Sequence, residues 1–514
     1  MKKISLKDPA VLDEMKVCAE SVRPIYDEPK IEHGLGNLDD NRPVDKVDEF
    51  LLTSEHSWVL SPAFHRAAIW NRVWTMQELS LAPHVTLVAG YYQLDWEVVA
   101  GFLGEKPYAD AFHSLYSHGR MSKALHSHFA GSQKVDHQRR ITREPGSESK
   151  LVDVLARFQS NRATDPRDRI YGLLGLVTDA HGIAVDYTKS PAQVFKDATL
   201  SLIENTGNLD MLCQTTWTSP SALAAAKHGR GVTGLPTWAA DFSLRIPSGE
   251  HSRLLFAQRG IYEAGKATLC VPCKIVNSDL LQLRAVILGR MQCDIALKRS
   301  RAMWNDDQYY APQQWLKDCD IGTEIAEDTK DKQKRYTRTN ELAIRAYWRT
   351  LLMDCAAYPV TRLTSDEIVA GDAAFRSILL YRSNEHNEDY SKANEASTDE
   401  HQDLDDSLVT KNLLRRWDQL SESMRCMWTR NYKCWSFAVT ENGLYTMIQH
   451  AMTGDLIASV QGAKVPLVLR PKGEFQGKKT YELVGAAYVH GFMDGEAFKA
   501  TAGIGLTEKE ILLQ

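Results

Sequence analysis

The sequence predicts an α/β unit followed by α+β regions with a strand-rich C-terminal part. Residues 62–81 have a helical pattern, and a short apolar strand follows directly at 84–90. Residues 230–295 alternate apolar and polar side chains in short runs, which is typical of a sheet. Residues 434–498 continue such runs, with an Asn-Gly turn at 441–443.

The first helix is predicted from its boundaries and its apolar face. Ser61 and Pro62 favour a helix start, because proline at the first helical position loses no hydrogen bond, and Pro83 ends the segment. Glu78 follows Trp74 by one helical turn, so both lie on one face at i, i+4 spacing. The inner face is expected to include Phe64, Ala67, Ala68, Val73 and Trp74.

Other elements of the first half are predicted from periodicity and capping signals. Residues 1–30 are expected to be helical, and a further helix is expected to begin near Trp96. Residues 118–148 are polar, rich in histidine and without clear period, which favours a surface insertion. Later helices are expected at 150–159, at 168–177 and at 191–204, the last with Gly207 as its C-cap.

In the second half, helices are expected beside a sheet. Residues 267–276 and 280–288 are the clearest strands. Amphipathic helices are predicted at 340–358 and 408–428. Residues 384–407 hold nine acidic side chains against one lysine and almost no large apolar residue. Such a stretch buries too little surface to offset its ordering entropy, so we expect a disordered linker.

Length, charge and cysteine usage indicate a cytoplasmic globular protein. At 514 residues the chain is long enough for about three domains. The net charge of −5 and pI near 6.4 give no basic surface, so nucleic acid is not an expected partner. No apolar run reaches the roughly 18 residues of a membrane span, and the N-terminus lacks a secretory signal. Nine scattered cysteines fit free thiols in a reducing compartment.

Two groups of side chains invite a metal interpretation, and for both we favour a structural one. Cys270 and Cys273 lie in an alternating strand pattern without a second pair at zinc spacing. The histidines lie in an irregular polar segment without supporting cysteines, which favours a solvated loop; they are His113, His118, His126, His128 and His137. We therefore expect no metal and no cofactor. P-loop, zincin and serine-hydrolase motifs are also absent from the sequence.

An alternating charge cluster precedes the apolar residues 170–176. It comprises Asp165, Arg167, Asp168 and Arg169. Capping and ion pairing are its expected roles, and assembly with another protein is the alternative.

Four stretches, in order, resemble the fungal heterokaryon-incompatibility (HET) domain family. Residues 72–79 (RVWTMQEL) resemble its R-x-W-T-x-Q-E block. Residues 165–176 (DPRDRIYGLLGL), with Asp186 and Tyr187, resemble its RD-x-(I/V)-Y-(A/G)-LLGL … DY stretch. Residues 235–243 (LPTWAADFS) and the strand-rich segments from 454 to 496 resemble its later elements. The resemblance implies a role in nonself recognition and programmed cell death, through protein partners or self-assembly.

The sequence departs from the family pattern at its beginning. The ALSY-x-WG and WID-x-x-CINQ blocks that open a HET domain do not occur, so we expect the chain to lack the N-terminal half of that domain. The expected parts are a C-terminal piece of a HET domain at 1–110, a helical and irregular connecting region at 111–229, a mixed sheet and helix region at 230–383, the acidic linker at 384–407, and a helix plus β-rich region at 408–514.

The resemblance also implies a possible activity. HET domains are similar to Toll/interleukin-receptor (TIR) domains, several of which cleave NAD with a glutamate on a Trp-Cys-x-x-Glu helix. Residues 74–78 have this spacing, with Thr75 in place of cysteine. Glu78 would stabilise the positive charge that develops on the ribose, and Trp74 would bind the substrate. The alternative, which we favour for the chain as it stands, is a catalytically inactive binding or regulatory pseudodomain.

Overall fold

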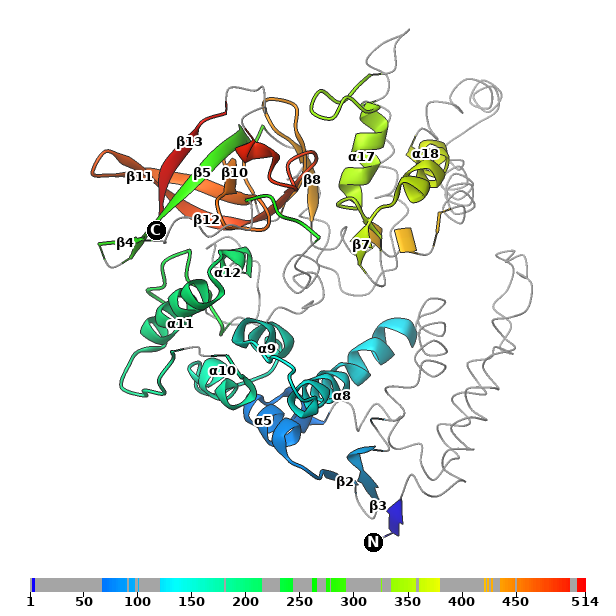
Figure 1. Cartoon of the computed structure of the whole chain (residues 1–514), viewed down its shortest axis with the longest axis vertical. Helices are drawn as coiled ribbons and strands as arrows, with labels where there is room; N and C mark the ends of the chain where they lie inside the picture. Colours follow the sequence, from blue (N-terminus) through cyan, green and yellow to red (C-terminus); the bar gives the residue numbers. More distant parts are fainter. Residues whose placement is uncertain are drawn as a thin grey trace, which may run out of the picture. The chain divides into compact units, whose positions relative to one another are not determined.

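The computed structural model describes a little over half of the chain in two compact units. Its main described ranges are 67–89, 92–97, 121–179, 182–214, 232–243, 261–265, 274–277, 279–292, 334–356, 360–379, 435–448, 451–499 and 506–514, with residues 2–4 and a few shorter pieces. Unit 1 contains residues 1–187 and 245–247, and unit 2 contains residues 188–244 and 248–514 (Figure 1). The predicted linker at 384–407 and the Cys270–Cys273 pair lie outside the described residues. The expected five-part division stays a prediction.

Unit 1 is mainly helical and carries one small sheet. Its helices are η2 (Ala68–Asn71), α5 (Val73–Leu81), α8 (Met121–Arg143), α9 (Leu151–Phe158), α10 (Asp168–Tyr171) and η3 (Leu174–Leu176). Its strands are β1 (Lys2–Ile4), β2 (Thr86–Ala89) and β3 (Tyr92–Asp95), in the order β1-β3-β2. The strand expected after the first helix is confirmed as β2. The helical assignment of residues 2–4 is wrong, because their backbone pairs with β3.

The predicted helix at 62–81 begins later than expected. Arg72 is extended, with φ −97° and ψ 135°, and separates η2 from α5. The reason is a backbone bridge: the Val73 N–H donates to the Arg162 carbonyl at 3.0 Å, and the Arg162 N–H donates to the Asn71 carbonyl. In α5, which begins after this break, Val73 is buried and Trp74 is 42% exposed. The expected inward position of Trp74 is therefore wrong.

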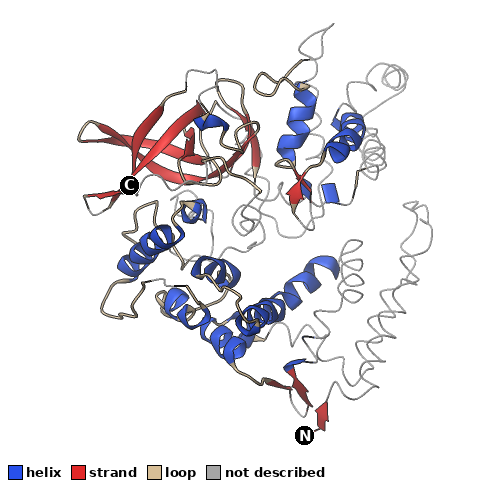
Figure 2. Cartoon of the chain, viewed as in Figure 1, coloured by secondary structure: helices blue, strands red, loops and turns tan. Residues whose placement is uncertain are grey.

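Residues 121–143 form a long helix, α8, and not the expected irregular insertion (Figure 2). The buried positions at its C-terminal end follow helical spacing, but several are polar: Ser132, Val135, Asp136, Gln138 and Arg139. Several of their polar groups are bonded inside the unit; the Gln138 amide, for example, donates to Ser149 Oγ at 3.0 Å. Because these buried residues are partly polar, the spacing of apolar residues in the sequence could not reveal the buried face of α8.

The predicted helix at 150–159 is confirmed as α9. The one predicted at 168–177 is instead two short turns, α10 and η3, divided at Gly172 and Leu173. A Cβ on Gly172 would lie 2.8 Å from Val73 Cγ1, so glycine permits the close approach of this segment to α5.

Unit 2 begins with two helices, α11 (Pro191–Thr206) and α12 (Asp210–Gln214). The predicted α11 is confirmed together with its C-cap, since Gly207 has φ 63°. Ser190 and Gln193 form a capping box at its N-terminus: each side chain accepts a hydrogen bond from the backbone N–H of the other.

The strand-rich part of unit 2 is a closed ring of five strands. The ring consists of β5 (Leu280–Arg290), β10 (Leu456–Val460), β11 (Leu467–Phe475), β12 (Lys478–Val489) and β13 (Glu508–Leu513). Neighbours follow the order β11-β10-β5-β13-β12, and β12 also pairs with β11, which closes the ring. All these pairs are antiparallel except β12–β13.

Three further strands flank the ring: β4 (Lys274–Val276), β8 (Ser436–Val439) and β9 (Tyr445–Ile448). β4 pairs with β5, while β9 continues from β12 and pairs with β8. The described strands within 274–290 and 436–489 confirm the sheet and strand predictions there. The turn at 441–443 is also confirmed, with Gly443 at φ 80°. The chain thus has mixed helices in its N-terminal part and a largely antiparallel, strand-rich C-terminal part.

Besides η5 (Glu496–Phe498), two helices and a small hairpin also belong to the described part of unit 2. They are α17 (Ala343–Leu351), α18 (Ser365–Leu379), β6 (Cys355–Ala356) and β7 (Thr361–Arg362). The predicted helix at 340–358 is shorter than expected, because Met353 and Asp354 have positive φ and turn the chain into β6. Tyr347 packs on Phe437 of β8 with ring centroids 4.7 Å apart, and Trp348 stacks on Phe375 of α18 at 4.7 Å. No helix of the described ranges is long and apolar enough to cross a membrane.

Candidate functional site

The predicted pair Trp74 and Glu78 lies on the solvent-facing side of α5. Both side chains are exposed, one helical turn apart. Trp74 extends toward α10, since a Cβ on Gly172 would lie 3.4 Å from Trp74 Cδ2. A ligand could therefore reach both side chains, and the proposed reaction at Glu78 stays a prediction.

The predicted charge cluster contains the expected ion pairing, but α10 has no side-chain cap. Arg167 contacts both carboxylate oxygens of Asp165 through Nε and Nη2, at 2.6–3.2 Å. Its Nη1 donates to the Tyr187 carbonyl at 2.6 Å. The Tyr187 hydroxyl donates to Asp168 at 2.6 Å, which, with some burial, raises the pKa of Tyr187 to about 12. The cluster thus fixes the segment after residue 182 to the start of α10.

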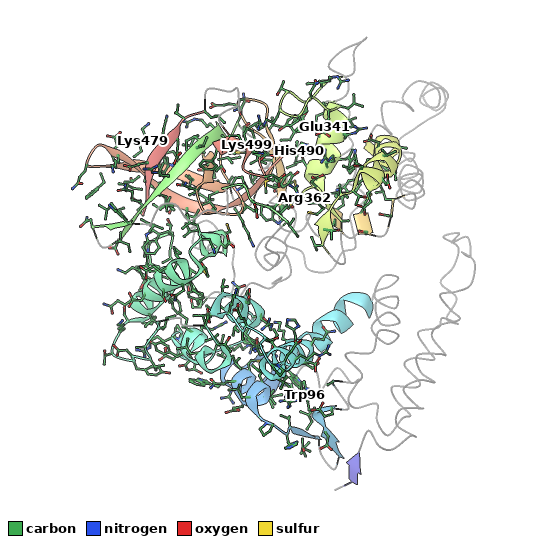
Figure 3. The ribbon with its side chains drawn as sticks, in the orientation of Figure 1. Trp96, Glu341, Arg362, Lys479, His490 and Lys499 are labelled. Atoms are coloured by element: carbon green, nitrogen blue, oxygen red, sulfur yellow. The ribbon has the colours of Figure 1, made fainter. Side chains whose placement is uncertain are left out.

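A larger group of charged side chains lies in unit 2, which we call the ion network. It comprises Glu341, Arg349, Asp354, Arg362, His490 and Asp494. Glu341 lies just before α17, Arg349 lies in α17, and Asp354 lies in the turn after it. Arg362 belongs to β7, and His490 and Asp494 belong to the turn after β12. The network therefore joins the α17 region to the end of β12, a strand of the ring (Figure 3).

The inner end of the network is a carboxylate–imidazole–hydroxyl row. Glu341 Oε1 lies 2.6 Å from His490 Nε2, and His490 Nδ1 lies 2.9 Å from the Tyr488 hydroxyl. Burial alone would raise the pKa of Glu341. The hydrogen bonds and charge of His490, with Thr339 and Arg349, outweigh burial and lower this pKa to about 2. Glu341 is therefore ionised at neutral pH.

The middle of the network holds a strained turn in place. Arg349 Nε donates to Asp354 Oδ1 at 2.7 Å, and Arg362 Nη1 donates to Oδ2 at 3.0 Å. Asp354 has φ 55° and follows Met353 at φ 52°, a conformation that side chains other than glycine adopt at a cost. Burial lowers the pKa of Arg349, but the hydrogen bond to Asp354 and nearby carboxylates raise it above its ordinary value.

At its outer end the network reaches solvent. Arg362 Nη2 donates to both oxygens of Asp494 at 2.6 and 2.7 Å, and the Asp494 side chain is 57% exposed. The Arg362 guanidinium also lies 4.9 Å from the ring centroid of Tyr262.

The network supports binding and rigidity better than covalent catalysis. Cys355 is buried, and burial raises the pKa of its thiol to about 12, so it is not a ready nucleophile. The Tyr488 hydroxyl is also buried, with its pKa raised by burial, so it does not face solvent. Within the described ranges no group of three or more His, Cys, Asp or Glu is placed to hold a metal ion.

Sequence reasoning missed most of this network. It predicted strands within 434–498, where Tyr488 and His490 lie, but it gave no role to Glu341, Arg349, Asp354 or Arg362. Glu341 and His490 are 149 residues apart, so no local spacing could pair them. The one local signal was the i, i+8 placement of Glu341 and Arg349 at the start and end of one helical pattern.

Two comparisons with known proteins find a similarity to Het-6. Residues 303–502 match the Het-6 beta-barrel domain, which covers the ion network and the barrel strands except β5 and β13. The chain is also 23% identical over 491 residues to "Heterokaryon incompatibility protein 6, OR allele" of Neurospora crassa, covering 87% of this chain and 66% of that protein. The chain thus spans about two thirds of that relative's length, and no solved structure matches it. These findings make it a distant homologue of that protein, with a Het-6 beta-barrel domain in its C-terminal region.

Proposed function

We propose that this protein acts in heterokaryon incompatibility, the process named in the description of its distant homologue. The similarity over 491 residues carries the proposal. The protein would act in the cytoplasm of a fungus and would recognise another protein or a second copy of itself, with cell death as the outcome.

In this proposal unit 2 is the recognition module. Its ion network ties the half-buried Arg362 and the exposed Asp494 to the buried Glu341 and His490 through a chain of direct contacts. A partner that binds the outer pair would therefore meet a surface held in one geometry. Preorganisation of this kind lowers the entropy cost of binding.

The test is an incompatibility assay in a filamentous fungus that expresses the full chain. Strains carrying it are fused with a panel of tester strains, and hyphal death and heterokaryon growth are scored. We expect death with at least one tester and reduced death for Asp494→Asn. Glu508→Gln, an exposed carboxylate of β13, is the matched control. No response with any tester would contradict the proposal.

Cleavage of NAD by a TIR-like unit 1 is a second candidate. The observation that favours it is the joint exposure of Trp74 and Glu78 on one turn of α5. Glu78 would stabilise positive charge on the ribose as nicotinamide leaves, and Trp74 would stack on a ring of the substrate.

This candidate is tested by NAD consumption with purified full-length protein. We expect activity that Glu78→Ala abolishes and that Glu148→Ala, an exposed carboxylate of the same unit, retains. Absence of NAD loss in the wild type, together with cell death that survives Glu78→Ala, would leave recognition as the function.

A further inference from the structure

Arg139 in unit 1 is a buried cation with half of its guanidinium unused. The side chain comes from α8 and is 1% exposed. Its Nη1 donates to the carbonyls of Leu79 and Ala82, the latter at 3.0 Å, at the C-terminal end of α5. Its Nε and Nη2 are both buried, and neither has a hydrogen-bond partner. A buried donor without an acceptor costs about 1–3 kcal/mol, and more when the group is charged.

The unused edge is the one that arginines of this protein present to carboxylates. Nε and Nη2 together form a planar fork that matches two oxygens of one carboxylate or phosphate group. Three described arginines use both atoms in this way: Arg167 on Asp165, Arg345 on Asp372 and Arg470 on Asp455. Arg139 is more deeply buried than these three, yet its fork is empty.

Trp96 and Ser80 also carry buried polar atoms without a hydrogen-bond partner. Trp96, which is labelled in Figure 3, is 1% exposed. Its ring centroid lies 5.3 Å from Arg139 Cζ. Its indole Nε1 has no acceptor. Ser80 lies between the two residues whose carbonyls Arg139 contacts, and its hydroxyl is also buried and unbonded. The region therefore offers donors from three side chains and no acceptor for them.

Arg139 and the arginines around it outnumber the nearby carboxylates by one. The carboxylates near Arg139 are those of Glu97 and Asp136. Glu97 pairs with Arg143 at 3.2 Å, and Asp136 pairs with Arg140. Three arginines thus face two carboxylates, and the one without a carboxylate partner is the most buried. Burial, followed by the charge of Arg143, lowers the pKa of Arg139.

We propose that Arg139, Trp96 and Ser80 form a buried binding site for a small oxyanion, a carboxylate or a phosphate group. Two oxygens of the anion accept from Nε and Nη2 of Arg139, and the indole N–H of Trp96 and the Ser80 hydroxyl supply further donors. The anion supplies the missing negative charge. Because Arg139 also binds the terminal carbonyls of α5, an occupied site would hold α5, α8 and the segment at Trp96 together.

The test uses purified full-length protein with sodium phosphate and sodium acetate as the two probes. Binding is measured by calorimetry and by the rise in Tm, against sodium chloride at matched ionic strength. We expect saturable binding of at least one probe, and the stronger probe tells a phosphate site from a carboxylate site. Binding should persist in about 0.5 M sodium chloride, because buried charges are screened far less than exposed ones.

Conservative variants assign the binding to this site. Trp96→Phe removes the indole N–H and keeps an aromatic ring, and we expect about tenfold weaker binding for this one lost bond to an ion. Arg139→Lys keeps the charge and removes the fork, so binding should be lost. Arg140→Lys is the matched control on the exposed side of α8, with binding unchanged. If neither probe saturates, or if Trp96→Phe binds as the wild type does, the proposal is wrong.

Discussion

His490 uses both nitrogens of its ring and so joins Tyr488 to Glu341 at the buried end of the ion network. Nδ1 lies 2.9 Å from the Tyr488 hydroxyl, and Nε2 lies 2.6 Å from Glu341 Oε1. The negative charge of Glu341 is balanced by Arg349, whose Nη1 lies 2.9 Å from Oε2.

Replacing Glu341 by glutamine should destabilise the protein in a pH-dependent way. The pKa of Glu341 is about 2 in the folded protein against an ordinary value of 4.5. A lowered pKa means stabilisation that is complete above pH 4.5 and is lost as pH falls toward 2, worth about 3 kcal/mol at most. Urea unfolding should show this deficit for Glu341→Gln at pH 7 and a smaller one below pH 4.5. A deficit that does not shrink in acid would contradict the ion-pair account.

For single residues, the sequence predicted some positions correctly and others wrongly, for physical reasons that the structure shows. Trp74 and Glu78 were placed on one helical face because spacing alone decides that, and both are exposed on α5. The inward position of Trp74 was wrong because Arg162, 90 residues away, interrupts the helix at Arg72. Contacts between distant segments leave no trace in local periodicity.

At the scale of elements, predictable helices are those whose buried face is apolar. α9 and α11 show apolar periodicity with caps and were predicted within a few residues. The buried face of α8 includes Gln138 and Arg139, which bond to groups elsewhere in unit 1, so the pattern looked like a loop. The end of α17 was missed because Cys355 is buried in β6, where its apolar character continued the apparent helical pattern.

The capping box of α11 should stabilise unit 2 measurably. Ser190→Ala removes the side-chain acceptor for the Gln193 N–H at 3.3 Å. We expect a loss of about 1 kcal/mol in the free energy of unfolding. Ser190→Asp is the matched control, because it keeps an acceptor at the N-cap; a loss equal to that of alanine would contradict the capping role.

Gly265 should be intolerant of any side chain. Its N–H donates to the Ala463 carbonyl at 2.9 Å, and an added Cβ would overlap the carbonyl oxygens of Val460 and Ala463. We expect Gly265→Ala to cost about 3 kcal/mol, the upper end for overpacking. Gly473→Ala on β11 is the control, since its Cβ would meet only Thr480 Oγ1, at 3.8 Å. Chemical denaturation of both variants checks the difference.

At the scale of the whole molecule, β13 closes the barrel between β5 and β12. Removing residues 508–514 would leave one edge of β5 and one edge of β12 unpaired and would expose their apolar side chains. We expect this deletion to abolish the cooperative unfolding transition of unit 2 and to cause aggregation, measured by circular dichroism and light scattering.

A variant with substitutions on the surface of β13 is the control for the deletion, because it changes side chains and keeps the strand. Glu508 and Lys509 are exposed, so replacing both by glutamine should leave the transition in place. A deletion variant that unfolds as cooperatively as the wild type would show that β13 is dispensable.

The pairing of β13 with β5 also affects the rate of folding. Glu508 pairs with Val286, a separation of 222 residues, and parallel register with β12 adds no short loop to help. Closing so long a loop costs entropy before any contact repays it, so barrels of this connectivity fold slowly. Until β13 arrives, β5 presents an open edge during and after synthesis. The nascent protein should therefore depend on chaperones, and its yield should fall when they are depleted.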